Sequence, residues 1–462
     1  MIIENRPFDE LHPGDTAELR RLLTGDDLLV FASSSGNHNP MHNPDTDVDG
    51  DGVPESIAPG MFIASFLSAV LGNLLPGPGT LYRSQSITFH TQARAGEELV
   101  ARVTVTAKHD DGSVSLDTEV RRIWDDMQIL SGVATVQAPV TKMRFENVEI
   151  PGLLVQRHRH FQAILKTAEP LPSLITAVVC PDEPNSLGGA ILAMKHSIIT
   201  PILVGPEAGI RAAAAEMDVD LSGIEIVDAA DDKAAAEAAV ALVNAGRAQA
   251  IMKGHLHTDD LLMPMLDKVN GLRIGKRFTH VFVMDVPGVP HPLLVTDAAI
   301  NIAPDLTTKV DIVQNAIDLA ISLGIEMPRV GVLSAVETVN PAIPSSIDAA
   351  LLSKMAERGQ IKGGYVDGPL AMDNAVNMAA ARTKGIAGEV AGRAQVLVVP
   401  GIDAGNMLVK QLAFLSHAEA AGLVLGAKVP VILNSRSDSS MARLASAAVA
   451  AIHHHRINGG AA

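Results

Sequence analysis

The chain has 462 residues and a mass of 48.4 kDa, so it is too long for one hydrophobic core and is expected to form two to four domains. Hydrophobic residues make up 47% and charged residues 19%, a balance that predicts folded α/β domains and excludes a largely disordered chain. The formal net charge of −16 argues against a general binder of nucleic acids or anionic membranes, because both need a basic protein surface.

Cys180 is the one cysteine, so the chain cannot form an internal disulfide. Its place at the end of an apolar run indicates a small buried residue rather than a nucleophile. The first residues, MIIENRPFDELHPGD, lack the basic and apolar regions of a secretion signal, and no segment approaches the roughly 18 apolar residues of a membrane span. We therefore expect a cytoplasmic protein.

Residues 33–44, SSSGNHNPMHNP, have the character of an active-site loop. Pro40 fixes its own backbone and keeps Asn39 out of the helical region, so the loop can direct Asn37 and His42 toward one point. General acid/base chemistry needs a carboxylate beside the imidazole, because an amide cannot exchange a proton near neutral pH. Asn37 is therefore the unexpected residue of this loop.

An acidic stretch, NPDTDVDGDGVPES, follows this loop. Its alternating carboxylates are Asp45, Asp47, Asp49 and Asp51. The alternation is similar to the start of a calcium-binding loop, but position twelve is Ser56 or Ala58 in the two possible frames, and neither is the bidentate glutamate. We interpret the stretch as a solvated acidic insertion, with a calcium site as the alternative.

A helix and a run of strands come next. The apolar sequence APGMFIASFLSAVLGNLL predicts one helix that begins at Pro59-Gly60 and ends before PGPG at residues 76–79. From about residue 80 to 142, β-branched and polar residues alternate, and DDG at residues 110–112 predicts a hairpin. This order predicts an antiparallel sheet wrapped around a buried helix.

The loop GNHNPMH at residues 36–42 and the following IAPGMFIASFLSAVLGNLLPGPGTLYRSQSITFH resemble the MaoC-like family of R-specific enoyl-CoA hydratases. The resemblance covers about residues 10 to 142 and implies an α+β hotdog domain. It also implies that His42 is the catalytic imidazole, that Gly60 offers a backbone donor to the thioester oxygen, and that Asn37 occupies the position of the catalytic aspartate.

Three interpretations of Asn37 remain open. The domain is a weakened or lost hydratase that still binds acyl-CoA, since loss of the proton transfer lowers the rate by about 10²–10⁴. Alternatively, His38 or an acid from the next loop replaces the missing carboxylate. In the third interpretation the domain is purely structural and serves dimerisation.

After about residue 160 the sequence changes to short apolar runs that alternate with Ala-rich helical stretches. The runs are LITAVVC, TPILVG, GIEIVDA, AQAIMKG, THVFVMDV, PRVGVLSAV, AQVLVVP and PVILNS. They predict strands buried on both faces, with crossover helices between them, in an open α/β fold. We place one domain at residues 1–145, a linker at 146–160 and a second domain at 161–462.

Ligands of open α/β sheets gather where a strand leads into a helix N-terminus. The sequence VILNSRSDSS places Ser435, Arg436 and Asp438 at such a point, where a hydroxyl and a guanidinium can bind an anion and a carboxylate can take a proton. A capped helix with a surface ion pair is the alternative.

Weaker candidates lie in other loops. Gly405 and Asn406 stand at a predicted helix start where the backbone can approach a phosphate, with Lys410 about one turn further along, and a plain helix cap is the alternative.

Residues of roughly 165 to 450 resemble the phosphate acetyltransferase and phosphate butyryltransferase family, through segments such as MKGHLHTDDLL, LLVTDAAINIAPDL, VPGIDAGNMLVKQL and VILNSRSDSS. The resemblance implies a two-lobed α/β fold of the isocitrate and isopropylmalate dehydrogenase type, and acyl transfer between coenzyme A and inorganic phosphate. It implies that Ser435 and Arg436 contact the acyl phosphate. It also makes Lys253 in MKG and Asp367 in VDGPLAMDNA candidates for the lining of the cleft between the lobes, with ordinary turn chemistry as the alternative. Asp438 is the candidate base for the CoA thiol, which has a pKa of about 8.5 and is mostly protonated at neutral pH.

The sequence therefore predicts a MaoC-like hotdog domain fused to a phosphate acyltransferase. The expected partners are acyl-CoA, inorganic phosphate or acyl phosphate, and further copies of the chain, without nucleic acid, membrane, metal or redox cofactor. Two alternatives remain. A metal-dependent hydroxyacid dehydrogenase would need a nicotinamide site, and no G-x-G-x-x-G follows a strand. The other alternative is a non-catalytic acyl-CoA sensor.

Overall fold

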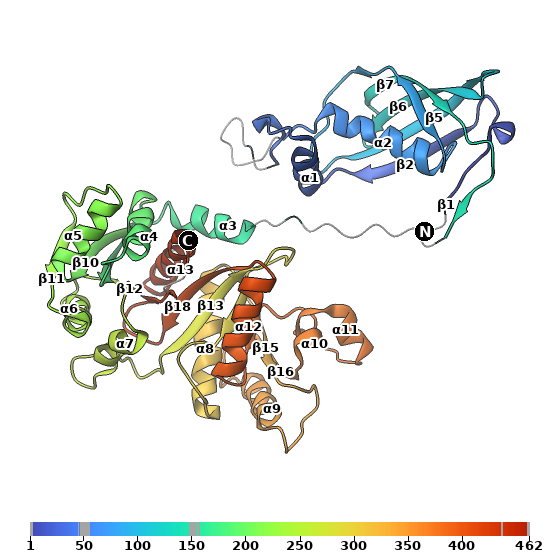
Figure 1. The fold of residues 1–462 in the computed structure, drawn as a ribbon. Coiled ribbons are helices and arrows are strands. Elements are labelled where there is room, and N and C mark those ends of the chain that lie inside the picture. Colours follow the sequence, from blue (N-terminus) through green and yellow to red (C-terminus); the bar gives the residue numbers. More distant parts are fainter. Residues whose placement is uncertain are drawn as a thin grey trace. The chain divides into compact units, whose positions relative to one another are not determined.

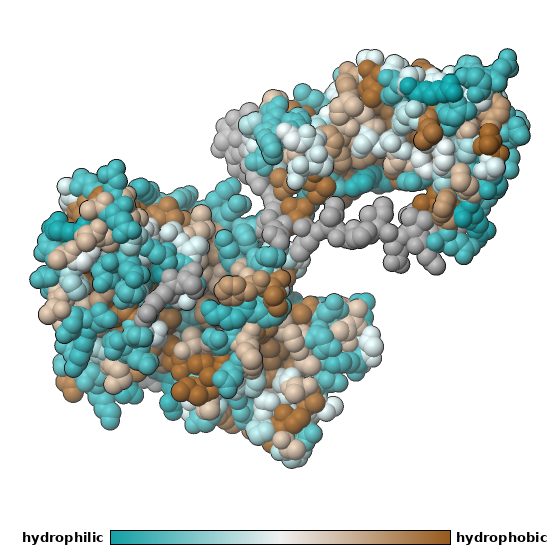
Figure 2. All heavy atoms as spheres, in the orientation of Figure 1, coloured by the Kyte–Doolittle hydropathy of each residue, from teal (hydrophilic) through white to brown (hydrophobic). Residues whose placement is uncertain are grey.

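The computed structural model describes residues 3–44, 46, 56–146, 155, 158–435 and 438–459. The chain forms two compact units, residues 1–155 and 156–462 (Figure 1). The visible face of each unit mixes hydrophilic and hydrophobic side chains, as the surfaces of folded proteins generally do (Figure 2). In the described part of the chain, no helix has the length and apolar character needed to cross a membrane. The four alternating aspartates of residues 45–51 and Arg436 lie outside the described residues.

The N-terminal unit is an antiparallel sheet with a helix lying across it (Figure 1). Its strands are β1 (Ile3–Glu4), β2 (Thr16–Leu22), β3 (Leu81–Gln85), β4 (Thr88–Phe89), β5 (Glu98–Lys108), β6 (Ser113–Arg122), β7 (Gln128–Gln137) and β8 (Arg144–Phe145). Its helices are α1 (Gly25–Ser35), α2 (Gly60–Asn73) and the short 3-10 helices η1 (Phe8–Glu10) and η2 (Pro40–His42). The main sheet has the order β2-β5-β6-β7-β3, β4 also pairs with β7, and β1 pairs with β8.

Helix α2 supplies much of the core of this unit. It begins after Pro59 and ends ahead of PGPG, as the sequence predicts. Phe66 and Leu67 of α2 are buried in one cluster with Leu99 of β5 and Leu116 of β6. The predicted strands and the hairpin at residues 110–112 are confirmed. The N-terminal unit is therefore a sheet wrapped around a buried helix.

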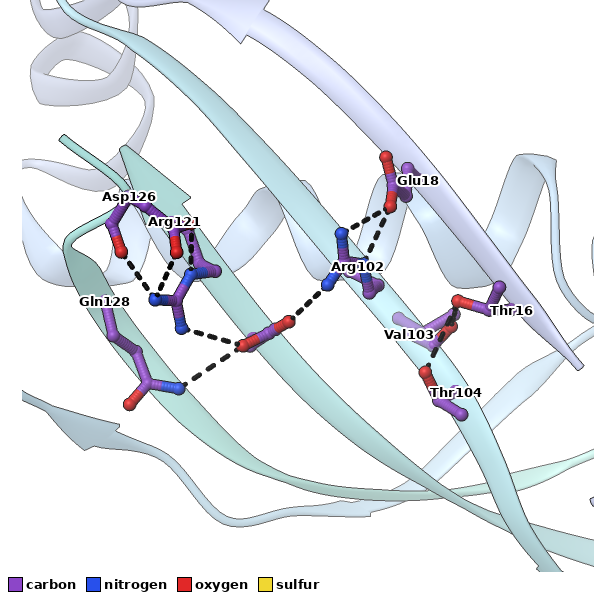
Figure 3. Close-up of polar contacts among 9 residues, drawn as sticks. Thr16, Glu18, Arg102, Val103, Thr104, Arg121, Asp126 and Gln128 are labelled. Carbon is purple, nitrogen blue, oxygen red and sulfur yellow. Dashed lines mark hydrogen bonds and ion pairs between the residues drawn. The ribbon is translucent and has the colours of Figure 1, made fainter. Parts of the chain in front are cut away.

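The opposite face of this sheet is polar (Figure 3). The guanidinium of Arg102 in β5 lies 2.7 Å from Glu18 of β2 and 2.9 Å from Glu119 of β6. Glu119 also accepts hydrogen bonds from Arg121 at 3.4 Å and from Gln128 at 3.3 Å. Exposed ion pairs stabilise the fold by only about 0–1 kcal/mol each, but this row of charges shows that the face is solvated and not packed against a helix.

The C-terminal unit alternates helices and strands. Its strands are β9 (Leu174–Val179), β10 (Ile199–Gly205), β11 (Glu225–Asp228), β12 (Ala250–Lys253), β13 (Thr279–Asp285), β14 (Leu293–Thr296), β15 (Arg329–Leu333), β16 (Tyr365–Leu370), β17 (Val396–Val398), β18 (Glu419–Leu425) and β19 (Val431–Ile432). Its helices are α3 (Arg159–Ala168), α4 (Pro184–Lys195), α5 (Glu207–Glu216), α6 (Asp232–Asn244), α7 (Thr258–Leu266), α8 (Leu306–Ser322), α9 (Pro344–Glu357), α10 (Met372–Val376), α11 (Met378–Thr383), α12 (Ile402–Leu415) and α13 (Ser440–Ile457).

One sheet runs through this unit in the order β11-β10-β9-β12-β19-β18-β13-β14-β17-β15-β16. All eight apolar runs of the sequence form strands, so that prediction is confirmed. The predicted crossover pattern does not hold in the middle of the sheet, where β13 pairs antiparallel with both β14 and β18. Only residues 286–292 join β13 to β14, which is too short for a crossover helix and suits an antiparallel turn.

Strands β9, β12 and β19 are parallel neighbours, so their carboxyl ends lie at one edge of the sheet. Helix α4 follows β9 and helix α13 follows β19, which brings two helix N-termini to the same edge. This is where open α/β sheets bind their ligands.

Candidate functional site

Two adjoining cavities lie at this edge of the C-terminal sheet. The larger, of about 440 Å³, is lined by Lys253 at the end of β12, by Asn406 and Lys410 of α12, and by Ser435 after β19. The smaller, of about 190 Å³, shares Lys410 and Ser435 and adds Asp438. These five residues come from three separate segments of the sequence, and they line two cavities that share part of their walls.

The larger cavity suits an anion. Its described lining contains two lysines and no carboxylate, although the whole chain has a net charge of −16. Lys253 is only 4% exposed, so water screens its charge less than at the surface. Helix α13 begins beside the cavities, and its N-terminus adds a partial positive charge.

The loop between β19 and α13 is held by the carboxylate of Asp438. Its Oδ2 accepts the backbone N–H of Ser435 at 2.8 Å and the side-chain amide of Asn434 at 3.3 Å. The N–H of Asp438 donates to the carbonyl of Ser435 at 3.1 Å and closes the turn. Asn185, at the start of α4, donates to the carbonyl of Asp438 at 3.1 Å. In this conformation Asp438 therefore positions Ser435 and joins the loop to α4.

Arg443 of α13 is buried beneath this loop, with 1% of its surface exposed. Its guanidinium donates to the carbonyl of Ser435 at 3.0 Å and to that of Lys253 at 3.5 Å. Within the described residues its Nε has no hydrogen-bond partner. Burial lowers the pKa of Arg443, and the neighbouring Asp438 carboxylate opposes that shift. One buried cation thus connects the carboxyl ends of β12 and β19.

In the N-terminal unit, His42 lies half-buried in η2. Its Nδ1 is 2.7 Å from the carbonyl of Ile57. A carbonyl can only accept, so Nδ1 carries the proton and Nε2 keeps its lone pair. The side-chain oxygen of Asn37 accepts the N–H of Asn39 at 3.3 Å and so supports the loop itself. The imidazole is therefore oriented as a base, whereas Asn37 serves the backbone of its own loop.

Gly60 is the first residue of α2, so its N–H belongs to the helix-terminal groups that have no intrahelical acceptor. Phe89 of β4 packs directly on it, and a Cβ at position 60 would lie 2.8 Å from the Phe89 ring. Position 60 therefore combines a helix N-terminus with packing that excludes a side chain.

Known proteins resemble each unit. Residues 232–451 match the family model described as "Phosphate acetyl/butaryl transferase", and residues 12–123 match the one described as "MaoC like domain". A phosphate acetyltransferase of Rhizobium meliloti is 56% identical over 296 residues, which cover 64% of this chain and 94% of that protein. The chain belongs to the phosphate acetyl/butyryltransferase family.

Two further members of the family lie close to this chain. A phosphate butyryltransferase of Clostridium beijerinckii is 42% identical over 294 residues, which cover 64% of this chain and 97% of that protein. The crystal structure of a branched-chain phosphotransacylase from Enterococcus faecalis V583 matches with a TM-score of 0.54 and 34% identity, covering 61% of this chain and 99% of the other. The C-terminal unit therefore has the phosphotransacylase fold, and the N-terminal MaoC-like domain is additional to it.

Gly405, a candidate for backbone contact with a phosphate, lies inside α12. Its N–H donates to the carbonyl of Gly401 at 3.1 Å. A Cβ at position 405 would lie 2.9 Å from Ala298, so the glycine allows α12 to pack closely there. Asp367 lies in β16, outside the described lining of the two cavities.

Cys180 is buried, as the sequence predicts. Burial raises the pKa of its thiol, and Asp232, whose Oδ1 lies 3.5 Å from the sulfur, raises it further. A thiolate nucleophile is therefore disfavoured at this position. Among the described residues, no group of three His, Cys, Asp or Glu side chains is arranged to hold a metal ion.

Sequence reasoning missed Arg443, Asn434 and Phe282, which contact or line the site. Arg443 had a detectable signal, because it is a charged residue within the apolar stretch MARLASAAVAAI. Burying such a charge is costly, so its presence there indicates a specific partner. Asn434 and Phe282 gave no comparable signal, since both are ordinary residues at the end of or within a strand.

Proposed function

We propose that the C-terminal unit transfers a short acyl group between coenzyme A and inorganic phosphate. The observation that carries this proposal is the larger cavity, where Lys253 and Lys410 face a described lining without carboxylates at the carboxyl ends of parallel strands. Phosphate and acyl phosphate are the kind of anion that such a site attracts. The names of the similar proteins, phosphate acetyltransferase and phosphate butyryltransferase, support the same reaction.

In the proposed reaction, the CoA thiolate attacks the carbonyl carbon of the acyl phosphate, a C–S bond forms, and phosphate leaves with the electrons of the C–O bond. Negative charge then develops on the carbonyl oxygen and on the leaving phosphate, where Lys253, Lys410 and Arg436 would stabilise it. Ser435 would orient the acyl phosphate through its hydroxyl. Asp438 would accept the thiol proton, after exchanging its acceptor bond to the Ser435 backbone for one to the substrate.

For the fold of this unit, we propose the two-lobed arrangement of isocitrate and isopropylmalate dehydrogenases. Supporting this, one sheet extends through the whole unit, and the strand direction reverses at its centre, where β18 and β13 pair antiparallel. The hydroxyacid dehydrogenase reaction itself is not favoured, because membership of the transferase family accounts for the same residues.

For the MaoC-like domain, we propose that it binds acyl-CoA but hydrates enoyl-CoA slowly. His42 retains the orientation of a base, while the amide of Asn37 cannot exchange the proton that a carboxylate would. His38 is exposed, and the loop that would supply another acid lies largely outside the described residues. Two proposals compete with this one. In the first, His38 or an acid of the next loop replaces the missing carboxylate, and in the second the domain is purely structural.

The experiment that tests the transferase measures thiol release from acetyl-CoA and butyryl-CoA with and without inorganic phosphate. We expect phosphate-dependent release, and a loss of more than tenfold in Ser435→Ala. Ser416→Ala, at the end of α12 and outside the described lining of both cavities, is the matched control and should retain full activity. If no thiol release depends on phosphate, the acyl-CoA sensor becomes the better account of the chain.

A further inference from the structure

Another cavity of the C-terminal unit has a described lining that shares no residue with the two transferase cavities. Its volume is about 510 Å³, within the roughly 300–1,000 Å³ of small-molecule pockets. Strands β14, β15 and β17 are parallel, and their N-terminal ends contribute Leu293, Arg329 and Gln395 to the lining. The loop between β13 and β14, residues 286–292, supplies another part of it.

This cavity carries basic side chains without a balancing carboxylate. Its described lining includes Arg329, Arg393 and His291 but no aspartate or glutamate, in a chain whose net charge is −16. Asp373 of α10 adjoins the lining in sequence, but its carboxylate pairs with Lys384 at 3.1 Å. The electrostatics of the described lining therefore favour an anion.

Arg329 is the most constrained of these basic residues. Its N–H donates to the side-chain oxygen of Gln395 at 3.2 Å, and its carbonyl accepts the N–H of Gln395 at 2.8 Å, so its backbone is fixed. Its side chain is half-buried, and within the described residues its buried Nε has no hydrogen-bond partner. A buried donor without a partner costs stability, and a bound oxyanion recovers part of that cost.

The imidazole of His291 lies near this guanidinium. Burial lowers the pKa of His291, and the positive charges of His160 and Arg329 lower it further. Two basic groups of the lining are therefore close enough to act on one another, and both can face the same bound group.

The rest of the lining is mostly apolar. Its apolar members are Val286, Val289, Pro290, Leu293, Met372, Val376, Ala394 and Leu412. Apolar walls favour a hydrocarbon body because they remove its surface from water, and guanidiniums bind oxyanions through paired N–H donors. The lining therefore suits an organic anion that has both parts.

Helix α12 lies between this cavity and the transferase cavities. Leu412 lines this cavity, whereas Lys410 lines the other two. Residues two positions apart in a helix point in nearly opposite directions, so the two side chains face different sides of α12.

We propose that this cavity is a binding site for a small organic anion. Arg329 and Arg393 hold its oxyanion head group, a carboxylate or a phosphate ester, and Leu293 and Met372 contact its apolar body. This site goes beyond the proposed transferase and does not depend on it.

The test measures the binding of small probes to the full chain by isothermal titration calorimetry. Benzoate and phenyl phosphate carry the two head groups on the same apolar ring, benzamide has the ring without the charge, and acetate has a carboxylate without the ring. We expect benzoate or phenyl phosphate to bind at least about tenfold more tightly than benzamide and acetate, because the site recognises charge and apolar body together. The tighter of the two charged probes identifies the head group.

Arg329→Met should weaken this binding by about tenfold or more, since it removes the half-buried guanidinium and leaves the backbone bonds to Gln395 in place. Arg393→Met tests the exposed guanidinium independently and remains informative if Arg329→Met does not fold. The matched control is Arg382→Met, an exposed position of α11 outside the described lining, and it should bind the probe as the unmodified protein does. Lys410→Met should also retain binding, because Lys410 lines only the transferase cavities. Circular dichroism establishes which variants are folded.

Four results would overturn the inference. Neither charged probe binds saturably, or benzamide binds as tightly as benzoate and phenyl phosphate, or both arginine variants fold and bind the probe fully. In the fourth result, Lys410→Met loses binding while Arg329→Met keeps it, which places the probe in the transferase cavities. None of these measurements uses phosphate-dependent thiol release, so failure of the site and failure of the proposed function are distinguishable.

Discussion

The side-chain amide of Asn37 supports the backbone of its own loop, because its oxygen accepts a hydrogen bond from the N–H of Asn39. A carboxylate can accept the same hydrogen bond and can also exchange a proton. We therefore expect Asn37→Asp to raise the hydration of crotonyl-CoA by about 10²–10⁴, provided that only the acid is missing. Loss of the conjugated thioester absorbance measures the reaction.

The double variant Asn37→Asp, His42→Ala should abolish that gain, because it removes the imidazole that the Ile57 carbonyl orients and that we propose as the partner base. A gain that survives without His42 would show that the new carboxylate works in another way. No gain in the single variant would mean that the domain has lost more than one catalytic group.

Variants of Arg443 can separate an effect on transferase activity from an effect on the stability of the fold. Replacing Arg443 by methionine removes a buried charge but leaves two carbonyls without this donor, which costs about 1–3 kcal/mol of stability. Arg443→Met removes the donors to the carbonyls of Ser435 and Lys253, so we expect a loss of more than tenfold in phosphate-dependent thiol release while the protein stays folded. The loss should appear mainly in kcat, because Arg443 positions the loop and is not in the described lining of either cavity.

Arg443→Lys is the conservative variant and should recover part of the activity, because one ammonium can still donate to the Ser435 carbonyl. Thermal unfolding of both variants provides the control for folding. Equal activity in the unmodified protein and in a folded Arg443→Met variant would show that the buried cation is dispensable for positioning.

Among single residues, the sequence identifies candidates whose local position stands out. Ser435 and Asp438 are recognisable because they stand between an apolar run and a helix start. The close approach of Gly405 to Ala298 was not predictable, because it depends on how α12 packs against a distant loop. The contacts of Arg443 have the same origin, because Lys253 lies 190 residues away in the chain.

Among the elements, apolar runs predict strands well, because strands that are buried on both faces leave little room for polar residues. The eight runs are all strands, but three further strands, β14, β16 and β18, did not stand out. Pairing direction is harder to predict, because it depends on the connections. The antiparallel pairing of β13 with β18 joins segments separated by more than 130 residues, which periodicity cannot reveal.

Helix α13 carries a buried imidazole that makes stability depend on pH. His453 lies 2.9 Å from the Ser322 hydroxyl of α8, and burial lowers its pKa to about 4. In the unfolded chain the pKa is about 6.5, so the unfolded state takes up the proton first as the pH falls. We expect this group alone to cost about 2 kcal/mol of unfolding free energy between pH 7 and pH 5.

The measurement is urea unfolding of the full chain at both pH values, followed by the helical circular dichroism signal. The glutamine of the His453→Gln variant cannot titrate but can still hydrogen-bond to Ser322. Between pH 7 and pH 5, the free energy of unfolding should therefore fall by about 2 kcal/mol less in this variant than in the unmodified protein. The same pH dependence in both proteins would contradict the assignment to His453.

For the whole molecule, the pattern of the sequence changes from alternating strands to α/β repeats at about residue 160. The structure divides the chain into two compact units after residue 155. The fusion of a MaoC-like domain to a phosphate acetyl/butyryltransferase domain was predictable because each has its own local motifs. Association with further copies of the chain depends on surfaces, and the exposed side chains of an edge strand become visible only in the folded sheet.

The N-terminal sheet has two different edges. Edge strand β2 contains three charged residues, Glu18, Arg20 and Arg21, of the kind that discourage pairing with another chain, and it exposes 53% of Leu22. Edge strand β3 contains one charged residue, Arg83, and exposes 67% of Leu81 and 43% of Tyr82. An exposed apolar edge is a template for association. We expect the protein to be a homo-oligomer through this edge, with a mass by light scattering that is a multiple of 48.4 kDa.

Leu81→Lys should shift the measured mass toward a smaller assembly, because it places a charge on the associating edge. Val140→Lys is the matched control, since Val140 is 77% exposed in the same unit but lies outside the strands. If the C-terminal unit alone holds the copies together, neither substitution changes the mass. A monomer at every concentration in the unmodified protein would instead show that the β3 edge has no such partner, and hydrogen exchange of the β3 amides would then be rapid.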